Sequence, residues 1–600
     1  MPKLVKNWNF KLLFGPKGET ALLTIRTEAE KISYQFINKW KNRTDWQEKP
    51  AVLREALDEY EAWARNFGAN SVEDYYWGLR QTQDQTSPAI KAKTNQAEEQ
   101  SQKIGNDIQF FTLRLAKVAP AKQKEFLANP KLTKYHHFLE QLFAEAKYIL
   151  SEPEEKILSL DSAPAYRFWT RMTESFLAGE TRTVVVNSKK ETKNYEELLT
   201  LCSHENKPTR DRAAAAFNEI VAEYATVAEA ELNAILAHKK TTDELRGFTR
   251  PDAARHLSDD IDSATVDALL SAVEKNFSLP ARFYKLKAKL LGQPHLAYHE
   301  RNVPVGKIDK EIAYPAAVTL VRQVFGRLDP EFLAIYDRFL AAGQFDVFPA
   351  KGKAGGAYCA SGLLSSPTYI NLNYTNRLND ILTIAHEVGH GINNELQRPV
   401  RHSLDFGTPL ATAEVASTFM EDFVLEEILR TEKSEHAKLA ITLTKLNADM
   451  STIFRQVACY RFEQALHTAF RAKGYLSSAE IGKLFQKHMK AYMGPAVDQS
   501  AGSENWWVYW GHIRNFFYVY SYASGLLISK ALQAKVKAEP RFIAQVRDFL
   551  AAGESASPKT VFAKLGLNIS DPKFWATGLT EIAHSLTEAE KLAKKLNYRI

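Results

Sequence analysis

Along most of the chain, apolar residues return at steps of three and four positions, with polar residues between them. This is the repeat of an α-helix that buries one face. One long stretch of this kind spans residues 87–118 and contains no proline after Pro88. Further helices are expected over about 209–245, 314–326, 437–473 and 515–535. The pattern therefore predicts a mainly α fold.

Between residues 345 and 374 the helical repeat gives way to clustered glycines and then to an alternating stretch. A period of two places every second side chain on one face of a strand, so a small β-sheet is expected here. The strand is interpreted either as ordinary sheet or as an edge that pairs with the backbone of another, extended chain. The glycines either serve turns or let a ligand approach the backbone. If the segment binds substrate, the contacting residues would be Tyr369, Asn371, Asn373, Gly355 and Gly356.

One domain boundary is expected within the chain. Near residue 190 the β-like run TRTVVV gives way to a polar segment. The boundary would separate an N-terminal helical region, residues 1–190, from a second region, residues 191–600, that contains the segment HEVGH and the candidate catalytic residues described below. The pattern leaves open whether the protein is a monomer or a homo-oligomer.

Composition and charge argue against several classes of protein. The 600 residues are 45% hydrophobic and 25% charged, as in ordinary globular proteins. No apolar run is long enough to cross a bilayer, and the amino terminus lacks the apolar stretch of a secretory signal. Three widely spaced cysteines favour a reducing compartment, so a cytoplasmic protein without a membrane partner is expected. The net charge is +7, but the basic residues are scattered among 71 acidic ones, which gives nucleic-acid binding little support.

The segment 386–390 reads HEVGH, a pattern that is typical of zinc sites in peptidases. Residues four apart project from one face of a helix, so His386 and His390 could hold one cation together. A catalytic zinc keeps three protein ligands and one open position, so a third ligand is needed. Glu387 lies beside the ligand face and is suited to take a proton from the water that the metal activates. Asp380, near the start of the helix, complements its positive end and is expected to support the site.

A helical stretch over residues 411–428 offers the third ligand. Glu414 follows His390 by 24 residues and has apolar neighbours, so its carboxylate would be partly buried and in need of a partner. Ser417 and Glu421 recur on the same face and could orient the ligands. A glutamate on a helix is otherwise usually just solvated. The spacing between HEVGH and the residues that follow it does not match the aminopeptidase pattern, the thermolysin pattern or the metzincin pattern.

A second unusual stretch, residues 506–525, is dense in aromatic residues. Tyr518, Tyr520 and Tyr522 follow His512 at six, eight and ten positions. Tyr518 and Tyr522 are one helical turn apart, so their hydroxyl groups could meet near His512. The alternative is a packed aromatic core. Beside a zinc triad, such neutral donors would suit the negative oxygen that develops during peptide hydrolysis.

These motifs resemble those of the oligoendopeptidase F family, zinc peptidases that are related to thimet oligopeptidase. The matching segments are NYT from Asn373, HEVGH from His386, AEVASTF from Ala413, and His512 with Tyr518, Tyr520, Tyr522, Ala523 and Gly525. The resemblance covers residues from about 70 to 590. It implies a bilobed, mainly α, zincin-type metallopeptidase, with a deep substrate channel and a small β-sheet beside the active-site helix. The chain departs from many relatives at Asn393, where they carry a histidine that does not bind the metal.

Together, the motifs and the resemblance predict a zinc-dependent endo-oligopeptidase that cleaves short, unstructured peptides. One Zn²⁺ per chain would be held by His386, His390 and Glu414, although such ligands also accept cobalt or manganese. Glu387 would be the general base, and His512 with the tyrosines would stabilise the oxyanion. Two alternatives are a dipeptidyl carboxypeptidase of the angiotensin-converting-enzyme type and an inactive peptide-binding scaffold.

Overall fold

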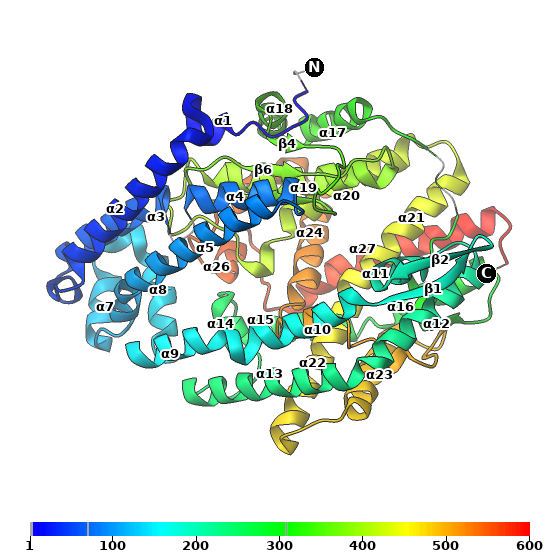
Figure 1. Ribbon diagram of the computed structural model, residues 1–600. Coiled ribbons are helices and arrows are strands. Elements are labelled where there is room, and N and C mark those ends of the chain that lie inside the picture. Colours follow the sequence, from blue (N-terminus) through cyan, green and yellow to red (C-terminus); the bar gives the residue numbers. More distant parts are fainter. Residues whose placement is uncertain (1–3, 69–70, 307, 309, 600) are drawn as a thin grey trace. The chain divides into compact units, whose positions relative to one another are not determined.

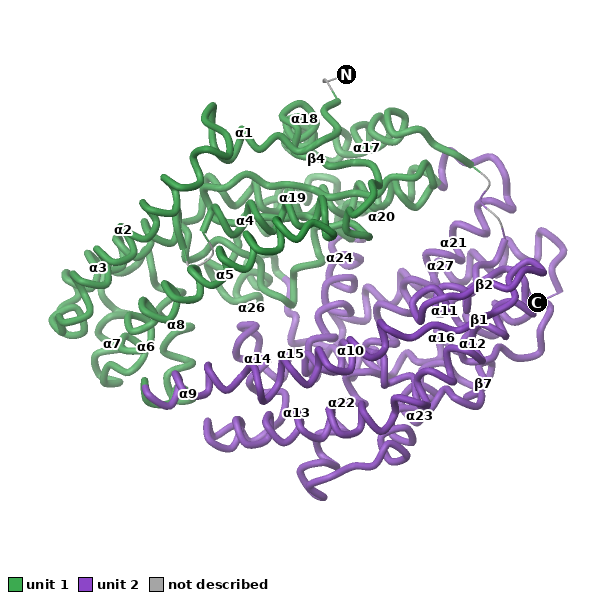
Figure 2. Tube along the Cα trace, viewed as in Figure 1, with its two compact units in different colours: residues 1–152, 310–428, 535–566 green, residues 153–309, 429–534, 567–600 purple. Residues whose placement is uncertain are grey.

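A computed structural model describes residues 4–68, 71–306, 308 and 310–599 of the chain. The chain divides into two compact units, each assembled from three separate stretches (Figure 2). Unit 1 comprises residues 1–152, 310–428 and 535–566, and unit 2 comprises residues 153–309, 429–534 and 567–600. Residue 190, the expected boundary, lies inside a β-hairpin of unit 2. The division into residues 1–190 and 191–600 stays a prediction.

Helices make up most of both units, which confirms the mainly α class (Figure 1). Those of unit 1 are α1 (Lys11–Phe14), α2 (Leu22–Trp40), α3 (Pro50–Asn66), α4 (Val72–Gln83), α5 (Pro88–Ile108), α6 (Phe110–Ala116), α7 (Pro120–Ala128), α8 (His136–Glu145), α17 (Tyr314–Leu328), α18 (Pro330–Ala342), α19 (Leu378–Gln397), α20 (Val415–Thr431), α25 (Ile543–Leu550) and α26 (Pro558–Lys564). The last residues of α20 belong to unit 2.

The helices of unit 2 are α9 (Glu152–Ser162), α10 (Phe168–Gly179), α11 (Tyr195–Leu201), α12 (Lys207–Glu223), α13 (Ala225–Arg246), α14 (Ala253–Ser258), α15 (Ser263–Glu274), α16 (Ser278–Leu290), α21 (Glu435–Asp449), α22 (Gln456–Lys473), α23 (Ser478–Met493), α24 (Tyr520–Ala538) and α27 (Pro572–Lys595). The first residue of α9 and the end of α24 belong to unit 1. None of the helices in the described part of the chain has the length and apolar character of a membrane span.

Three of the predicted helices are interrupted. The stretch 87–118 breaks at Gln109, between α5 and α6, where the adjacent Phe110 and Phe111 are both buried. The stretch 209–245 breaks at Tyr224, between α12 and α13. The stretch 437–473 contains a π-helical segment, Met450–Arg455, between α21 and α22. Periodicity does not reveal such breaks, because the apolar repeat continues through them.

The expected small sheet lies in unit 1. Its strands β4 (Phe345–Asp346), β6 (Tyr369–Asn371) and β5 (Tyr358–Ala360) are arranged in that order, and β6 pairs in parallel with β4 and antiparallel with β5. The prediction that the strand at Tyr369 is an edge is therefore wrong, because both sides of β6 are already paired. Tyr369 and Asn371 are fully buried, which removes them as substrate contacts. Asn373 donates its side-chain amide to the carbonyl groups of Ala354 and Gly356.

Unit 2 carries two sheets of two strands each. Strands β1 (Thr181–Val186) and β2 (Lys189–Asn194) form an antiparallel hairpin. Strands β3 (Leu296–Ala297) and β7 (Val497–Asp498) form a short parallel pair. The framework of unit 2 is therefore set by its helices.

Helix α19 is the central element for the candidate chemistry. Its apolar face is fully buried and comprises Ile381, Ile384, Val388 and Ile392. Helix α19 packs against α17, α18 and the small sheet, within unit 1. The anchored face fixes the rotation of α19 about its axis, and hence the direction in which HEVGH points.

Candidate active site

Helix α19 presents both histidines of HEVGH on one side, and Glu414, the residue just before α20, brings a carboxylate to them. Nε2 of His386 lies 3.3 Å from Oε2 of Glu414, and Nε2 of His390 lies 3.6 Å from the same oxygen. The three ligand atoms all lie within 4.8 Å of one another. Ligand atoms around a tetrahedral zinc, bonded at about 2.1 Å, are separated by about 3.4 Å. The triad therefore has the donor types and spacing that zinc requires.

Two further side chains of α20 contact the triad. The hydroxyl of Ser417 donates to Oε2 of Glu414 at 3.0 Å. Oε2 of Glu421 lies 3.1 Å from Nδ1 of His386, so it can hold the proton on Nδ1 and leave Nε2 free for a metal. Both residues lie where the sequence expects them. Each restrains a ligand by a hydrogen bond.

Asp380 and Asn393 lie away from the triad. Oδ2 of Asp380 accepts hydrogen bonds from the backbone N–H groups of Thr375 and Arg377, so this residue fixes the start of α19. The sequence predicts that Asp380 supports the ligands, but in the structure it does not contact them. Asn393 is buried, and its amide donates to the carbonyl of Leu550 at 2.9 Å. Asn393 thus links α19 to the end of α25 within unit 1.

Gly389 allows α19 and α20 to approach closely enough to assemble the triad. A Cβ atom on Gly389 would lie 2.6 Å from Cα of Ser417 and 2.7 Å from the carbonyl oxygen of Ala416. Both are backbone atoms, which cannot move aside as a flexible side chain would. Gly389 therefore sets the distance between α19 and α20, and hence the distance between Glu414 and the two histidines.

Replacing Gly389 with alanine is accordingly expected to push the helices apart. Overpacking of this kind lowers the free energy of unfolding by about 1–3 kcal/mol, and zinc affinity should fall with it. Urea unfolding and zinc titration would measure the two effects. Gly78→Ala is the matched control, because Gly78 also lies in a helix but no atom is within 4 Å of its Cβ position. Equal behaviour of the two variants would contradict the assigned role of Gly389.

The ionisable groups of the triad are strongly coupled. Burial acts to lower the pKa of His386, but hydrogen bonds to Glu414 and Glu421 outweigh it and raise the pKa to about 10. Burial lowers the pKa of His390 to about 4. For Glu414 burial is opposed by the hydrogen bond and charge of the imidazoles, which lower its pKa to about 2. The carboxylate is thus held ionised, as a metal ligand must be.

Glu387 is buried and sits next to the triad. Burial raises its pKa to about 7. The backbone N–H of Cys359, which donates to the carboxylate, acts in the opposite direction and lowers the pKa. A carboxylate with a pKa near neutrality can both accept and return a proton. Cys359 itself is half-buried, and burial raises the pKa of its thiol well above the usual range, so it is not a reactive thiolate.

A second group of possible metal ligands lies in unit 2 and comprises Asp211, His299 and Glu300. Its acidic charge is already balanced, since Oε1 of Glu300 lies 2.7 Å from Arg210 and 3.1 Å from Lys207. Because these two cationic side chains already contact the group, binding of a metal cation there is unfavourable. In the described part of the chain no lysine or arginine pairs with Glu414, which favours the triad of unit 1.

The aromatic segment belongs to unit 2. Nε2 of His512 lies 3.1 Å from the hydroxyl of Tyr522, which lies 2.8 Å from the hydroxyl of Tyr518. Tyr520 does not join them, because its fully buried hydroxyl donates to Asp259 at 2.8 Å. The interpretation of Tyr520 as an oxyanion donor is therefore wrong, and it serves the core instead. The other three form one hydrogen-bonded group on the wall of a cavity of about 640 Å³.

Backbone strain precedes this group and was not visible in the sequence. Phe516 and Phe517 have φ angles of 31° and 58°, a left-handed conformation that bulky residues rarely adopt. Oε1 of the buried Glu463 accepts the N–H of Phe517 at 2.9 Å. Arg255 donates to the carbonyl groups of Asn515 and Phe516 at 3.1 and 3.3 Å. These contacts hold the strained turn from which Tyr518 projects.

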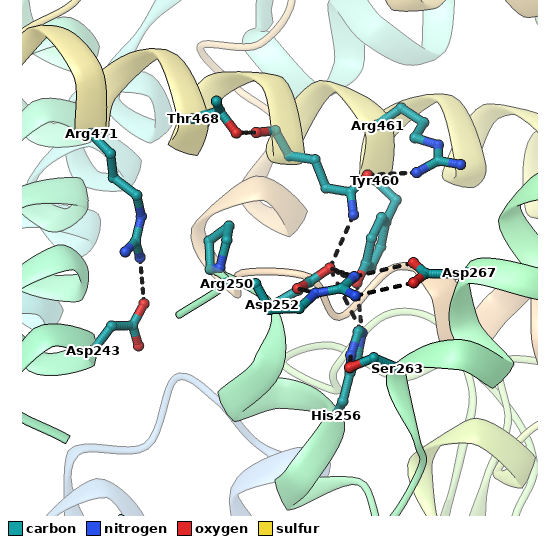
Figure 3. Close-up of polar contacts among 12 residues, drawn as sticks. Asp243, Arg250, Asp252, His256, Ser263, Asp267, Tyr460, Arg461, Thr468 and Arg471 are labelled. Atoms are coloured by element: carbon teal, nitrogen blue, oxygen red, sulfur yellow. Dashed lines mark hydrogen bonds and ion pairs between the residues drawn. The ribbon is translucent and has the colours of Figure 1, made fainter. Parts of the chain in front are cut away.

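A buried polar network supports α22, the helix that carries Glu463 (Figure 3). The hydroxyl of Tyr460 donates to Asp252 at 2.9 Å and lies 2.8 Å from Nε2 of His256. Arg250 pairs with Asp252 and, at 3.0 Å, with Asp267 of α15. The network ties α14 and α15 to α22 within unit 2. Sequence periodicity gives no signal for it, because its members come from distant segments.

The chain matches known protein families over most of its length. A family model described as Peptidase family M3 matches residues 200–581, and one described as Oligopeptidase F matches residues 115–179. An oligoendopeptidase F homolog of Lactococcus lactis subsp. lactis is 24% identical over 530 residues, 87% of each chain. Oligopeptidase PepF of Bacillus subtilis is 25% identical over 487 residues, 79% of this chain and 71% of that one.

Solved structures share the fold. A structure from Chlamydophila abortus superimposes with a TM-score of 0.84 at 21% identity and covers 98% of both chains. Oligoendopeptidase-F from Enterococcus faecium superimposes with a TM-score of 0.73 at 19% identity, covering 96% of this chain and 99% of that one. Both structures therefore share their architecture with this chain over nearly its whole length.

Proposed function

The chain belongs to peptidase family M3, and on that premise we propose that it is a zinc-dependent endo-oligopeptidase for short, unstructured peptides. Membership establishes an oligoendopeptidase F-type metallopeptidase, a hydrolase that acts on peptides. The observation that carries the finer proposal is the meeting of His386, His390 and Glu414 within 4.8 Å, beside the buried Glu387. The three cysteines are unpaired, which supports a cytoplasmic enzyme.

We assign the metal ligands to the triad, with one zinc per chain. When bound, zinc supplies Lewis acidity, which makes water more acidic and polarises a peptide carbonyl. Glu421 and Ser417 hold His386 and Glu414 in place through the hydrogen bonds described above. This restraint lowers the cost of ordering the ligands when a metal binds.

Glu387 is assigned the proton transfers. Its carboxylate takes a proton from the attacking water, whose oxygen bonds to the carbonyl carbon of the peptide. As the C–N bond breaks, Glu387 passes that proton to the departing amine. Burial supports this assignment, since it keeps competing water away and brings the pKa of Glu387 to about 7.

His512, Tyr518 and Tyr522 are assigned to stabilise the oxyanion. Their hydrogen-bonded grouping in unit 2 and the family resemblance support this role. Burial lowers the pKa of His512, with the charge of Arg455 acting in the same direction, so the imidazole is neutral. Neutral imidazole and phenol groups donate hydrogen bonds without a competing charge.

The substrate backbone is assigned to strand β5 instead of β6. In the described sheet β5 is an edge strand, and peptides commonly add to such an edge. The backbone N–H of Cys359, in β5, donates to Glu387, which places this strand next to the proposed base. The exposed Gly355 and Gly356 lie just before β5, where they could let a peptide approach.

Cleavage of a peptide blocked at both ends tests the proposal. An endopeptidase cuts an acetylated and amidated peptide at an internal bond, and mass spectrometry of the products identifies that bond. A dipeptidyl carboxypeptidase would release dipeptides only from a free carboxyl end. Stoichiometric zinc without cleavage of a mixed peptide pool would instead support a binding scaffold and overturn the proposal.

A further inference from the structure

Arg455 is a cation on the wall of the cavity in unit 2. It ends the π-helical segment Met450–Arg455 and lines the same cavity of about 640 Å³ as His512 and Tyr522. Its guanidinium lies over the ring of Trp510, with Cζ 4.3 Å from the ring centroid. π-helical turns are rare and often occur at functional sites. Here the segment ends in the one arginine that lines the described cavity.

Arg455 differs from Arg514 and Arg210, two buried arginines of the same unit, because no acid neutralises it. Arg514 pairs with Glu231 at 2.9 Å, and Arg210 pairs with Glu300 at 2.7 Å. Among the residues that the structure describes, none forms an ion pair with Arg455, and its Nε and Nη2 atoms have no hydrogen-bond partner. An uncompensated buried charge is strongly unfavourable. Its retention therefore calls for a ligand that supplies the missing charge.

The walls of the cavity suit an anionic ligand with hydrogen-bond acceptors. Side chains with N–H or O–H groups predominate among the described lining residues, which are Glu174, Arg455, Gln456, Tyr509, Trp510, Gly511, His512, Asn515, Tyr518 and Tyr522. Glu174 is the acid in this set, and it is exposed to solvent, so its charge is screened. The planar fork of an arginine matches the two oxygens of a carboxylate.

We propose that this cavity is a carboxylate-binding subsite, in which Arg455 binds a carboxylate of the peptide beside His512 and Tyr522. The inference rests on the proposed function, since that function makes peptides the ligands. The carboxylate is either the carboxyl terminus of the peptide or the side chain of an aspartate or glutamate within it. Arg455 would thus make the enzyme prefer peptides that carry a negative charge at a defined place.

Peptide binding to the full-length zinc-loaded chain tests the proposal, with Glu387→Gln present so that the peptides stay intact. One peptide sequence is prepared in three forms: with a free carboxyl terminus, with an amidated terminus, and amidated with glutamate in place of an internal glutamine. Calorimetry measures Kd for each form. A charge-assisted hydrogen bond predicts that one carboxylate form binds about 10- to 100-fold more tightly than the amidated form.

Adding Arg455→Gln is expected to remove this preference while the Kd of the amidated form changes less than about twofold. Arg455→Lys keeps the positive charge but lacks the planar guanidinium, so it should retain part of the preference for the carboxylate form. This variant provides a second test if Arg455→Gln does not fold. Arg461→Gln is the matched control. Arg461 lies on α22, close in sequence to Arg455, but pairs with Glu274 at 2.6 Å and does not line the described cavity.

The peptide form that binds more tightly identifies the source of the carboxylate. Equal Kd values for all three forms, no binding of any form, or a preference that survives Arg455→Gln would each overturn the subsite. These outcomes do not depend on turnover, so failure of the subsite and failure of the peptidase proposal can be told apart. An Arg455-dependent preference in a chain that cleaves no peptide before Glu387 is changed would keep the subsite and remove the peptidase.

Discussion

Replacing Glu387 with glutamine is expected to lower kcat/KM for peptide cleavage by about 10²- to 10⁴-fold, the usual contribution of a general base. Glutamine has nearly the same shape, and its carbonyl oxygen can still accept the N–H of Cys359. It cannot take a proton from water at neutral pH. The metal ligands are left unchanged, so zinc content should stay at one per chain. Turnover of an internally quenched peptide and elemental analysis of the purified chain measure the two effects.

Glu426→Gln serves as the control for this experiment. Glu426 lies on α20 but is exposed and pairs with Lys537, so the same chemical change should leave both turnover and zinc content unaltered. If Glu387→Gln retained more than about a tenth of the activity, proton transfer by Glu387 would be excluded. If Glu387→Gln lost zinc as well as activity, Glu387 would be needed to maintain the metal site, and the loss of activity could not be assigned to proton transfer.

The sequence predicts those parts of the site that depend on local geometry. His386 and His390 are four residues apart on one helix, so helical geometry alone places them together. The expected positions of Glu414, Ser417 and Glu421 come from spacing along the next helix. That these residues meet the histidines depends on Gly389, where the two helices touch. A sequence shows the glycine but not the helix that will pack against it.

Features that depend on pairing between distant segments were harder to predict. The alternating stretch at Tyr369 correctly indicates a strand, but its central place between β4 and β5 is a matter of strand order. Tyr520 has the same spacing and chemistry as its neighbours, yet its hydroxyl reaches Asp259, the residue that follows α14. The unpaired charge of Arg455 is invisible until its surroundings are known.

Replacing Glu414 with glutamine is expected to have the largest effect on the metal. The change removes one of three ligands and the only negative charge among them, so zinc affinity should fall by more than the roughly 10- to 100-fold typical of an outer-shell residue. Glu421→Gln provides that comparison, because Glu421 contacts Nδ1 of His386 at 3.1 Å without belonging to the triad. Competition with a chelator of known affinity gives both values.

Thermal unfolding provides a second measurement that does not depend on activity. A ligand that binds only the folded state raises Tm, and at a concentration about 1,000 times its Kd it stabilises the chain by about 4 kcal/mol. Adding a chelator should therefore lower the Tm of the unaltered chain. It should leave the Tm of the Glu414→Gln variant nearly unchanged, because little zinc is bound beforehand. A variant that bound zinc as tightly as the unaltered chain would show that the carboxylate of Glu414 is not a ligand.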